Sequence, residues 1–516
     1  MKLGSLVASL PAKKATIYTL ERGKVSRHAM AALAGDAIEA AENLRRWGVN
    51  PGARVGIYAP NSYRWLVYDL ALIELGAVSV PFTGDFAGKL DRALLDKYQI
   101  SLLLISTVSP QAPAKEPHIA YIDAENENVV AIPRYPCEND AGLLTLSFSS
   151  GSAGGLKGLE ISREGVEATG PPIFDAIGVE NTDRLLLFMP MSNFQQRNMC
   201  YSAIWYDFDL IITDYVQLMA GITTLHPTIL VAPPMYFQMI YTRFVNFPPF
   251  KKAAWTFLGN LLSYIPIPRL RRALAEILFE EFYRQFGGRM RLLITGMAPI
   301  KRDVATFFAK MQLPLCETYG LMETGSLTYR PANSKKFGSV GKPVPGVGLE
   351  FTEDGEIIVR REKSLTKRYF QSVEGENERT FIGPGRIATG DMGKLDQDGY
   401  LYLLGRKKEL IVTSGGYKIH PELVESELAG CPDIAQAAVF LKPGGVTLAA
   451  VIVLNHPENH EAQARTRDFV RSMTTTQAAQ IGNVIFAEAA FSVDNGMLRP
   501  NMKLDRRAIA AKHNLS

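Results

Sequence analysis

Short apolar runs that alternate with helical stretches constrain the fold of this 516-residue chain more than any other feature. Arg54–Ala59 is a mostly apolar run, Tyr63–Gly76 has helical character, and Ala77–Phe82 is a second apolar run. Strand, helix and strand at this spacing predict a parallel βαβ unit. Similar runs recur at Leu102–Ile105, Leu185–Phe188 and Thr228–Val231. An α/β architecture follows.

The character of the sequence changes after residue 338, where Gly338–Gly348 is rich in glycine and proline. Strands are predicted at Glu356–Arg360, Tyr400–Leu404 and Ala435–Phe440, and a helix at Pro421–Leu428. A chain of this length exceeds a single core. We therefore expect residues 1–407 to form a large domain of α/β layers with a β-rich subdomain. Residues 408–516 are expected to form a small, mobile α+β domain.

Composition excludes several classes of protein. A net charge of +4 is too small to indicate nucleic-acid binding. The four cysteines are scattered without a CxxC pair, so neither a zinc site nor a disulfide framework is predicted, and a cytoplasmic location is expected. No uncharged apolar run reaches the roughly 18 residues of a membrane-spanning helix. No GxSxG nucleophile motif is present.

One aromatic segment, Ala253–Ile267, has basic residues on both sides: Lys251, Lys252, Arg269, Arg271 and Arg272. Two interpretations remain open. A segment of this kind can lie on a membrane surface. The commoner use of such a helix is to cover part of a core, and we expect at most peripheral contact with a membrane.

A loop of small residues follows the apolar run Leu143–Phe148. It reads Ser149-Ser150-Gly151-Ser152-Ala153-Gly154-Gly155-Leu156-Lys157-Gly158. Small residues let backbone N–H groups converge on an anion, hydroxyls add donors, and the lysine adds positive charge. The Gly-Lys-Ser/Thr of the kinase and ATPase P-loop is absent. The loop predicts a phosphate site of another kind.

Four further motifs follow this loop along the chain. They are Gly296-Met297-Ala298-Pro299, then Glu317-Thr318-Tyr319-Gly320-Leu321-Met322-Glu323, then Thr389-Gly390-Asp391, and Gly405-Arg406-Lys407-Lys408 with Gly415-Gly416 behind it. Near the end, Gly496–Arg506 contains Lys503. Together they place phosphate donors and two separate carboxylates in one chain, in a fixed order.

In this order, the motifs resemble those of the adenylate-forming, or AMP-binding, enzymes, which include acyl-CoA synthetases, peptide-synthetase adenylation domains and luciferases. The resemblance covers nearly the whole chain, and the terminal motif has the form seen in long-chain acyl-CoA synthetases. It implies an AMP-forming ligase that uses ATP and Mg²⁺. In such a ligase a small-molecule acid becomes an acyl-adenylate and then passes to the thiol of coenzyme A, and the long-chain resemblance implies a medium or long fatty acid.

The resemblance also assigns roles to residues. Lys503, Lys157 and Arg406 match the catalytic cations, and Glu323 matches the magnesium ligand. Asn193, Met297 and Gly320 match acid-binding positions, Lys408 the hinge, and Gly415 and Gly416 the coenzyme A tunnel. The ATP- and AMP-binding positions are Ser149, Ser150, Gly151, Ser152, Gly154, Lys157, Gly296, Ala298, Pro299, Glu317, Thr318, Tyr319, Gly320, Asp391, Arg406 and Lys503.

Several residues depart from the family pattern close to the reacting atoms. Ala153 and Met322 stand where a threonine is usual, and Leu156 where a proline is usual. In Pro190–Arg197 the ends match, but Asn193 replaces a histidine and Gln196 replaces an acid. Asparagine donates a hydrogen bond but carries no charge near neutral pH. The acid, or the way it is held, is therefore expected to be unusual.

Two alternatives stay open beside the synthetase. A related ligase could activate an unusual acid such as nitrite, or use an acyl carrier protein or an amine as acceptor. The second alternative is a protein that binds a nucleotide without catalysis. It is disfavoured because the chain keeps the residues that match catalytic and ligand positions: Lys157, Glu323, Asp391, Arg406 and Lys503. The sequence leaves the acid's chain length and the oligomeric state open.

Overall fold

The computed structural model describes most of the chain and divides it into two compact units. Described are residues 1–113, 116–126, 128–132, 142–150 (Ser150 without its side chain), 156–298, 300–414, 416–442, 445, 447–473, 475, 477, 480–492, 494–498 and 504–515. Unit 1 comprises Met1–Leu349 and Val359–Ala388, and unit 2 comprises Glu350–Ile358 and Thr389–Ser516. Unit 2 thus begins before the expected boundary at residue 407. The place of a functional hinge remains a prediction.

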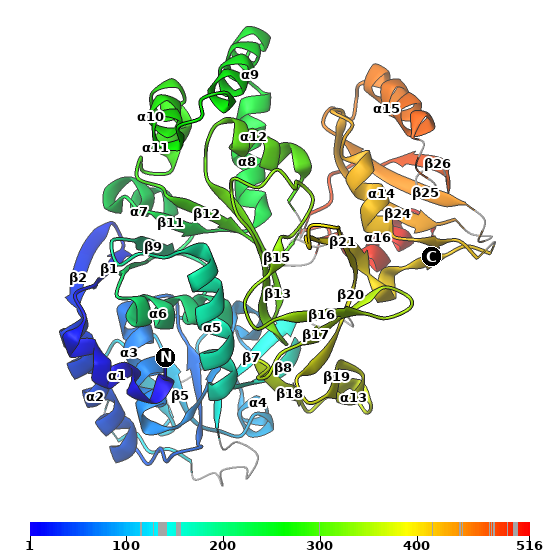
Figure 1. The fold of residues 1–516 in the computed structure, drawn as a ribbon. Helices are drawn as coiled ribbons and strands as arrows, with labels where there is room; N and C mark the ends of the chain where they lie inside the picture. Colours follow the sequence, from blue (N-terminus) through cyan, green and yellow to red (C-terminus); the bar gives the residue numbers. More distant parts are fainter. Residues whose placement is uncertain are drawn as a thin grey trace. The chain divides into compact units, whose positions relative to one another are not determined.

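Unit 1 contains two large sheets (Figure 1). The first has the order β15 (Lys342–Pro343), β14 (Gly325–Arg330), β13 (Leu315–Leu321), β12 (Leu292–Thr295), β11 (Ile229–Val231), β9 (Arg184–Leu187), β10 (Asp209–Ile212), β1 (Thr16–Glu21) and β2 (Lys24–Ala29). Its strands from β13 to β1 pair in parallel, and the edges pair antiparallel. Parallel strands covered on both faces explain the continuous apolar runs in the sequence.

The second sheet has the order β18 (Thr366–Phe370), β8 (Leu156–Ser162), β7 (Leu143–Ser150), β4 (Val78–Pro81), β3 (Arg54–Tyr58), β5 (Ile100–Ile105) and β6 (Ile119–Tyr121). β7, β8 and β18 pair antiparallel, whereas the remaining strands pair in parallel. The expected βαβ unit is therefore present, as β3, α3 (Tyr63–Leu75) and β4.

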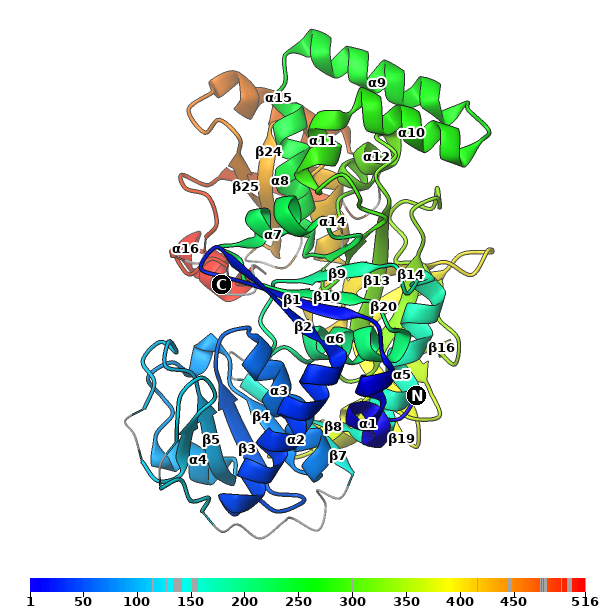
Figure 2. The ribbon, with the colours of Figure 1, turned by 90° about the vertical axis from the view of Figure 1, so that its left-hand side faces the viewer.

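Helices cover both faces of these sheets (Figures 1 and 2). The other helices of unit 1 are α1 (Leu6–Ser9), α2 (Met30–Arg46), α4 (Arg92–Lys97), α5 (Arg163–Ile177), α6 (Phe194–Tyr206), α7 (Leu218–Leu225), α8 (Pro234–Val245), α9 (Pro249–Ser263), α10 (Pro268–Leu278), α11 (Glu280–Gln285), α12 (Arg302–Lys310) and α13 (Glu376–Thr380). Short 3-10 turns lie at Leu3–Ser5, Leu10–Ala12 and Gly84–Phe86. None of the helices in the described part of the chain has both the length and the apolar character that crossing a bilayer requires.

Alternate residues of a strand enter different hydrophobic cores. In β9, Leu185 and Leu187 enter a core that also contains α2, α3, α5 and α6, whereas Leu186 enters a second core with α7, α8 and α12. In β5, Leu102 and Leu104 join the first core, and Leu103 faces a third core with α4. This alternation follows from the two-residue period of a strand. Unit 1 is thus a stack of helix and sheet layers, as the α/β prediction requires.

The described part of unit 2 combines small sheets with three α-helices. Its elements are β22 (Ile411–Val412), β23 (Lys418–Ile419), α14 (Pro421–Leu428), β24 (Ile434–Leu441), β25 (Leu448–Leu454), α15 (His460–Ser472), β26 (Ile481–Phe486) and α16 (Arg506–Lys512). A further sheet contains strands of both units and has the order β16 (Gly348–Phe351), β17 (Glu356–Arg360), β20 (Arg386–Leu395) and β19 (Phe381–Gly383), with β21 (Leu401–Arg406) beside β20. Strands β16, β17 and β20 each pass from one unit into the other.

Candidate active site

The hairpin of β7 and β8 holds the predicted phosphate loop at its tip. Ser149 pairs with Lys157 and Ser150 with Leu156 across the two strands. Gly151, Ser152 and Gly154 lie outside the described residues, as does the side chain of Ser150. Lys157 forms an ion pair with Glu376 at the start of α13, and its Nζ lies 4.9 Å from the ring centre of Tyr369. The predicted phosphate cation is therefore already paired with a carboxylate.

The predicted magnesium ligand, Glu323, lies in the turn between β13 and β14. This turn is held by neighbouring elements: the Thr366 hydroxyl donates to the Met322 carbonyl at 2.7 Å, and Arg361 donates to the Thr324 carbonyl at 2.9 Å. Glu323 itself is half-buried. Its carboxylate is thus presented on a fixed backbone at the end of a buried strand.

Tyr369 on β18 joins these two predicted residues. Its hydroxyl donates to Oε1 of Glu323 at 2.7 Å, while its ring faces Lys157. Burial raises the pKa of Tyr369, and the charge of Glu323 raises it further, so the hydroxyl stays protonated as a donor. The structure therefore brings Lys157 and Glu323, which are far apart in sequence, to the two sides of one tyrosine.

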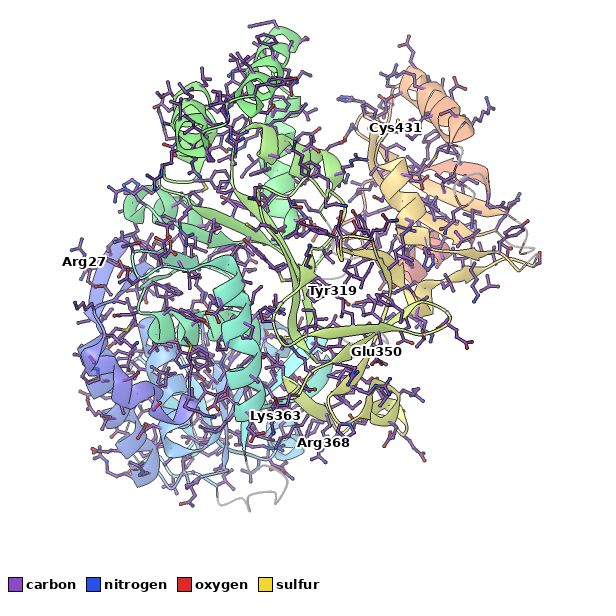
Figure 3. The ribbon with its side chains drawn as sticks, viewed as in Figure 1. Arg27, Tyr319, Glu350, Lys363, Arg368 and Cys431 are labelled. Carbon is purple, nitrogen blue, oxygen red and sulfur yellow. The ribbon has the colours of Figure 1, made fainter. Side chains whose placement is uncertain are left out.

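Glu317 and Tyr319 lie on β13, where Figure 3 marks Tyr319. The Glu317 carboxylate is buried and forms an ion pair with Arg330 of β14 at 3.2 Å. Burial raises the pKa of Glu317, and Arg330 opposes that rise. Tyr319 is also mostly buried. The Glu317 side chain thus links β13 to β14. Its contact with a nucleotide stays a prediction.

Two glycines allow close approaches to β13, one between β13 and β14 and one between the end of β12 and β13. A Cβ on Gly320 would lie 2.5 Å from the Gly325 carbonyl oxygen, and a Cβ on Gly296 would lie 2.9 Å from Oγ1 of Thr318. Met297 follows with φ of 69°, a left-handed conformation that costs free energy for a residue with a side chain. Ala298 is described and Pro299 is not. A strained residue at a strand end is a frequent mark of a binding site.

A largely apolar cavity opens beside these residues. Its walls come from α5, α6, β9, β11 and the ends of β12 and β13. Ile173, Phe174 and Ile177 of α5 supply much of the apolar surface, and Gly296, Met297, Thr318 and Gly320 line one side. Leu321 and Met322, the two residues before Glu323, also contribute. The cavity therefore leads to the strand end that carries the predicted metal ligand.

The first turn of α6 brings polar side chains to this cavity. Asn193 caps the helix, because its side-chain oxygen accepts from the Gln195 backbone N–H at 3.0 Å. Gln195, Gln196 and Asn198 line the cavity. Gln196 is only 1% exposed, yet its Nε2 has no hydrogen-bond partner among the described residues, and the same holds for Oδ1 of Asn198. Buried polar atoms without partners are costly, so these two atoms are unusual.

Arg197, next along α6, is occupied in a buried network. It forms an ion pair with Asp69 of α3, and both side chains are almost fully buried. Its guanidinium also donates to Ser79 of β4 and Thr145 of β7, each at 2.8 Å. The Tyr201 hydroxyl donates to Asp69 at 2.6 Å. Arg197 therefore joins α6, α3 and the second sheet rather than facing the cavity.

In unit 2, two predicted nucleotide residues contact each other. Asp391 of β20 lies opposite Arg406 of β21 in the strand register, and Nε of Arg406 lies 2.8 Å from Oδ1 of Asp391. The turn before Asp391 is fixed, because the Gly390 N–H donates to Glu356 at 3.1 Å and the Thr389 hydroxyl donates to the Ile357 carbonyl at 2.8 Å. Asp391 and Arg406 thus form one preassembled pair.

The remaining predicted residues of unit 2 lie around short turns. Lys408 is in a 3-10 turn, Lys407–Glu409, directly after β21, and Gly416 is in the turn between β22 and β23. Gly415 and Lys503 lie outside the described residues. The chain on both sides of residues 499–503 is anchored: Leu498 bridges to Leu504, and Arg506 contacts Glu425 at 2.7 Å and Glu409 at 3.2 Å.

Glu422 of α14 gives unit 2 a titrating group in the neutral range. Burial raises its pKa to about 7, the charge of Glu409 adds to the rise, and Arg506 opposes it. Glu425 and Asp391 raise the pKa further. Because the folded state favours the protonated acid, its stabilising contribution is complete below pH 4.5 and is lost as the pH rises through 7.

We predict that Glu422→Gln removes this pH dependence. Between pH 4.5 and pH 7, the wild-type free energy of unfolding should fall relative to that of the variant. Hydrogen exchange of the β24 and β25 amides at several pH values measures the free energy of unfolding within unit 2. Parallel pH profiles for the two proteins would show that Glu422 does not titrate in this range.

The sequence matches a known family over most of its length. The sequence model of the AMP-binding enzymes matches residues 7–370. The chain belongs to the AMP-binding enzyme family. It is an AMP-forming ligase with the α/β fold of that family.

Relatives of this AMP-binding enzyme include mycobacterial fatty-acid ligases. A long-chain-fatty-acid–CoA ligase, FadD15, from Mycobacterium bovis is 26% identical over 92% of this chain and 88% of its own length. FadD13 from Mycobacterium tuberculosis, also named as a long-chain-fatty-acid–CoA ligase, is 25% identical over 82% of each chain.

Solved structures share the fold at lower identity. An O-succinylbenzoate coenzyme A synthetase from Bacillus subtilis, solved with ATP and a magnesium ion, has a TM-score of 0.73 and 19% identity over 98% of each chain. ATP-bound MatB from Rhodopseudomonas palustris has a TM-score of 0.75 and 19% identity over 99% of each chain. The fold of the AMP-binding enzyme thus extends across both of its units.

The residues of the AMP-binding enzyme fit a magnesium ion held through its substrate. Among the described residues, no group of three acidic, histidine or cysteine side chains forms a complete metal cage. Magnesium commonly binds one or two carboxylates together with substrate phosphates. Glu323 uses one oxygen to accept from Tyr369, which orients its carboxylate. A single oriented carboxylate close to Lys157, the predicted phosphate-binding lysine, suits that arrangement.

Sequence reasoning missed Tyr369 and Glu376 of the AMP-binding enzyme. Neither lies in a glycine-rich motif, and neither is flagged by charge or periodicity. They reach the site because β18 pairs with β8, Phe370 lying opposite Gly158. Sequence reasoning also missed Arg330, whose ion pair with Glu317 follows from the β13–β14 hairpin.

Proposed function

We propose that this enzyme activates a carboxylic acid with ATP and transfers the acyl group to coenzyme A. The acid's carboxylate attacks the α-phosphate, which gives an acyl-adenylate and releases pyrophosphate. The thiol of coenzyme A then attacks the adenylate, which gives the thioester and AMP. The observation that carries the proposal is the apolar cavity, whose lining includes Leu321 and Met322, the two residues that precede Glu323 in the chain. The acyl chain would lie in the cavity, and its carboxylate would meet the nucleotide at that strand end.

Each predicted residue has a part in this scheme. Lys157 and Lys503 would supply positive charge to the phosphates and so stabilise the charge that develops in the transition state. Magnesium, held by Glu323, would supply the same electrostatic stabilisation to the phosphate oxygens. Asp391 and Arg406 would hold the ribose. Lys408 would be the hinge about which the C-terminal residues turn between the two half-reactions, as in other enzymes where closure completes a site.

The fatty character of the acid is supported by two observations. The cavity wall is mainly aliphatic and aromatic, with Ile173, Phe174, Val231 and Ile294 among its residues. Apolar walls of this kind recognise a hydrocarbon chain by burial rather than by hydrogen bonds. The relatives are named as long-chain fatty-acid ligases.

Pyrophosphate release tests the proposal. Mg·ATP is supplied with short, medium and long fatty acids, aryl acids and nitrite, each with and without coenzyme A, and thioester is detected by mass. Release with a fatty acid together with acyl-CoA is the expected result. Release of pyrophosphate without a thioester would indicate that the acyl acceptor is a carrier protein or an amine rather than coenzyme A. Absence of release with every acid would contradict the proposal.

A second candidate substrate is an acid that carries a polar group along its chain. The unpartnered Nε2 of Gln196 and Oδ1 of Asn198 favour it, because both residues line the cavity. A hydroxyl can accept from the first and donate to the second. A plain hydrocarbon chain would leave both atoms without a partner, at a cost of about 1–3 kcal/mol each.

We predict that Gln196→Leu shifts the selectivity from hydroxylated to unsubstituted acids. The ratio of kcat/KM for a hydroxy acid to that for the plain acid of equal length should fall about 10- to 100-fold. Met199→Leu is the matched control, since Met199 lines the same helix face of the cavity without a hydrogen-bonding group. An unchanged ratio in Gln196→Leu, for hydroxyls at every chain position, would show that Gln196 does not read the substrate.

A further inference from the structure

The α9–α10 hairpin lies at the edge of unit 1 (Figure 2). Its first helix, α9, has two apolar faces. The inner face of α9 packs on the core through Leu262, Trp255 and Leu258. The core-covering role considered for this segment therefore accounts for one face only. The outer face carries Phe250, Phe257, Leu261 and Tyr264, of which Phe250 is 76% and Tyr264 is 82% exposed.

The outward residues form a continuous stripe at helical spacing. With 3.6 residues in each turn, the side chains of Phe250, Phe257 and Leu261 in α9, and of Tyr264 directly after it, fall within an arc of about 60°. The next helix, α10, adds Leu270 and Ile277, and Ile267 lies directly before it; these three are also exposed. We call these seven residues the outer stripe. Single exposed apolar residues are ordinary, but a contiguous stripe on two adjacent helices marks an interaction surface.

Positive charge accompanies the outer stripe. Residues 249–278 contain five basic residues and one acidic residue, whereas the whole chain has an excess of only four positive charges. The nearby acids are already paired: Glu276 with Arg272, Glu281 with Lys251 and Glu280 with Arg284.

Two of the basic residues remain available. The guanidinium groups of Arg269 and Arg271 make no ion pair or hydrogen bond to any described residue, although the Arg271 backbone N–H donates to the Ile267 carbonyl. The two arginines flank Leu270 of the outer stripe in sequence. Their charges can therefore act on a partner outside the chain. The surface combines apolar side chains for insertion with free guanidinium groups beside them.

We propose that the α9–α10 hairpin docks this protein on an anionic lipid surface. The aromatic and aliphatic side chains of the outer stripe enter the boundary between headgroups and acyl chains, and the arginines contact lipid phosphates. A second copy of the chain is disfavoured as the occupant, because it would bring two basic surfaces together. The inference does not depend on the proposed reaction, since docking is measured without catalysis.

Vesicle sedimentation tests the docking. The full-length protein is mixed with phosphatidylcholine vesicles that contain or lack phosphatidylglycerol, at salt concentrations of about 0.01 M and about 1 M. The wild type should sediment with anionic vesicles at low salt, and much less with neutral vesicles or at high salt. Failure to sediment with anionic vesicles at low salt would overturn the proposal.

Variants separate the apolar and electrostatic parts. Phe257→Glu with Leu261→Glu should lower the partition coefficient at least about tenfold. Arg269→Gln with Arg271→Gln should lower it about fivefold for each charge removed and weaken its salt dependence. Val373→Glu is the control, since Val373 is 75% exposed and lies outside the hairpin. All substituted side chains are exposed or half-buried, and circular dichroism checks the fold.

Two results would contradict the docking. Wild-type partitioning of the Phe257→Glu, Leu261→Glu protein would show that the outer stripe does not insert. A concentration-dependent dimer that this variant abolishes, without any vesicle binding by the wild type, would assign the outer stripe to self-association. Pyrophosphate release with a water-soluble acid should be unchanged in these variants, because the hairpin does not line the cavity.

Discussion

Glu323→Gln should lower the rate of pyrophosphate release about 100- to 1000-fold at a fixed concentration of magnesium. The amide keeps an oxygen that accepts from Tyr369, so the turn between β13 and β14 should hold its shape. What is lost is the negative charge that a hard cation requires. The magnesium concentration for half-maximal rate should therefore rise as the rate falls, and a titration with Mg²⁺ at saturating ATP measures both.

Glu376→Gln is the matched control for this loss. It removes the other carboxylate near Tyr369, the one that pairs with Lys157, and leaves Glu323 in place. The magnesium dependence of this variant should match that of the wild type. If Glu323→Gln kept its rate and its magnesium dependence, while its circular dichroism remained native, Glu323 would not be the metal ligand.

Arg197→Leu should lower the free energy of unfolding of unit 1 by about 3–5 kcal/mol. The substitution leaves the Asp69 carboxylate buried without its counterion, and it removes donors from Ser79 and Thr145. Tyr201 alone would then hydrogen-bond to Asp69. An uncompensated buried charge costs far more than the lost contact itself.

Urea denaturation followed by tryptophan fluorescence measures this effect selectively. All four tryptophans, Trp47, Trp65, Trp205 and Trp255, lie in unit 1, and the Trp65 ring is 5.5 Å from the guanidinium of Arg197. The double variant Arg197→Leu, Asp69→Leu should recover part of the loss, because it removes the orphaned charge as well. A loss below about 1 kcal/mol would mean that the buried pair contributes as little as an exposed one.

The parts of the fold that follow from local pattern were predictable from the sequence. The run at Arg54–Ala59 and the helix after it became β3 and α3, because a parallel strand buried on both faces needs a continuous apolar run. Residues Pro421–Leu428 became α14 with the expected bounds.

Relations between distant strands were not predictable in the same way. The pairing of β18 with β8 brings Glu376 to Lys157 across 219 residues of sequence, and nothing in either local segment specifies it. Similarly, Asp391 and Arg406 were each expected to face a nucleotide, yet their contact with one another depends on the register of β20 and β21. Motifs indicate which side chains are chemically suited to a site, whereas strand pairing decides their neighbours.

Because Lys157 forms an ion pair with Glu376, its positive charge is already neutralised by a carboxylate of the same chain before any ligand binds. A phosphate that binds Lys157 must displace a carboxylate tethered to the same chain, and tethering gives that carboxylate a high effective concentration. Nucleotide affinity at this position is then the difference between two ion pairs rather than the full strength of one. A singly charged anion gains little from the exchange, whereas a triphosphate gains several charge-assisted contacts. The tethered carboxylate thus lowers the affinity of Lys157 for small anions more than its affinity for a polyanionic ligand.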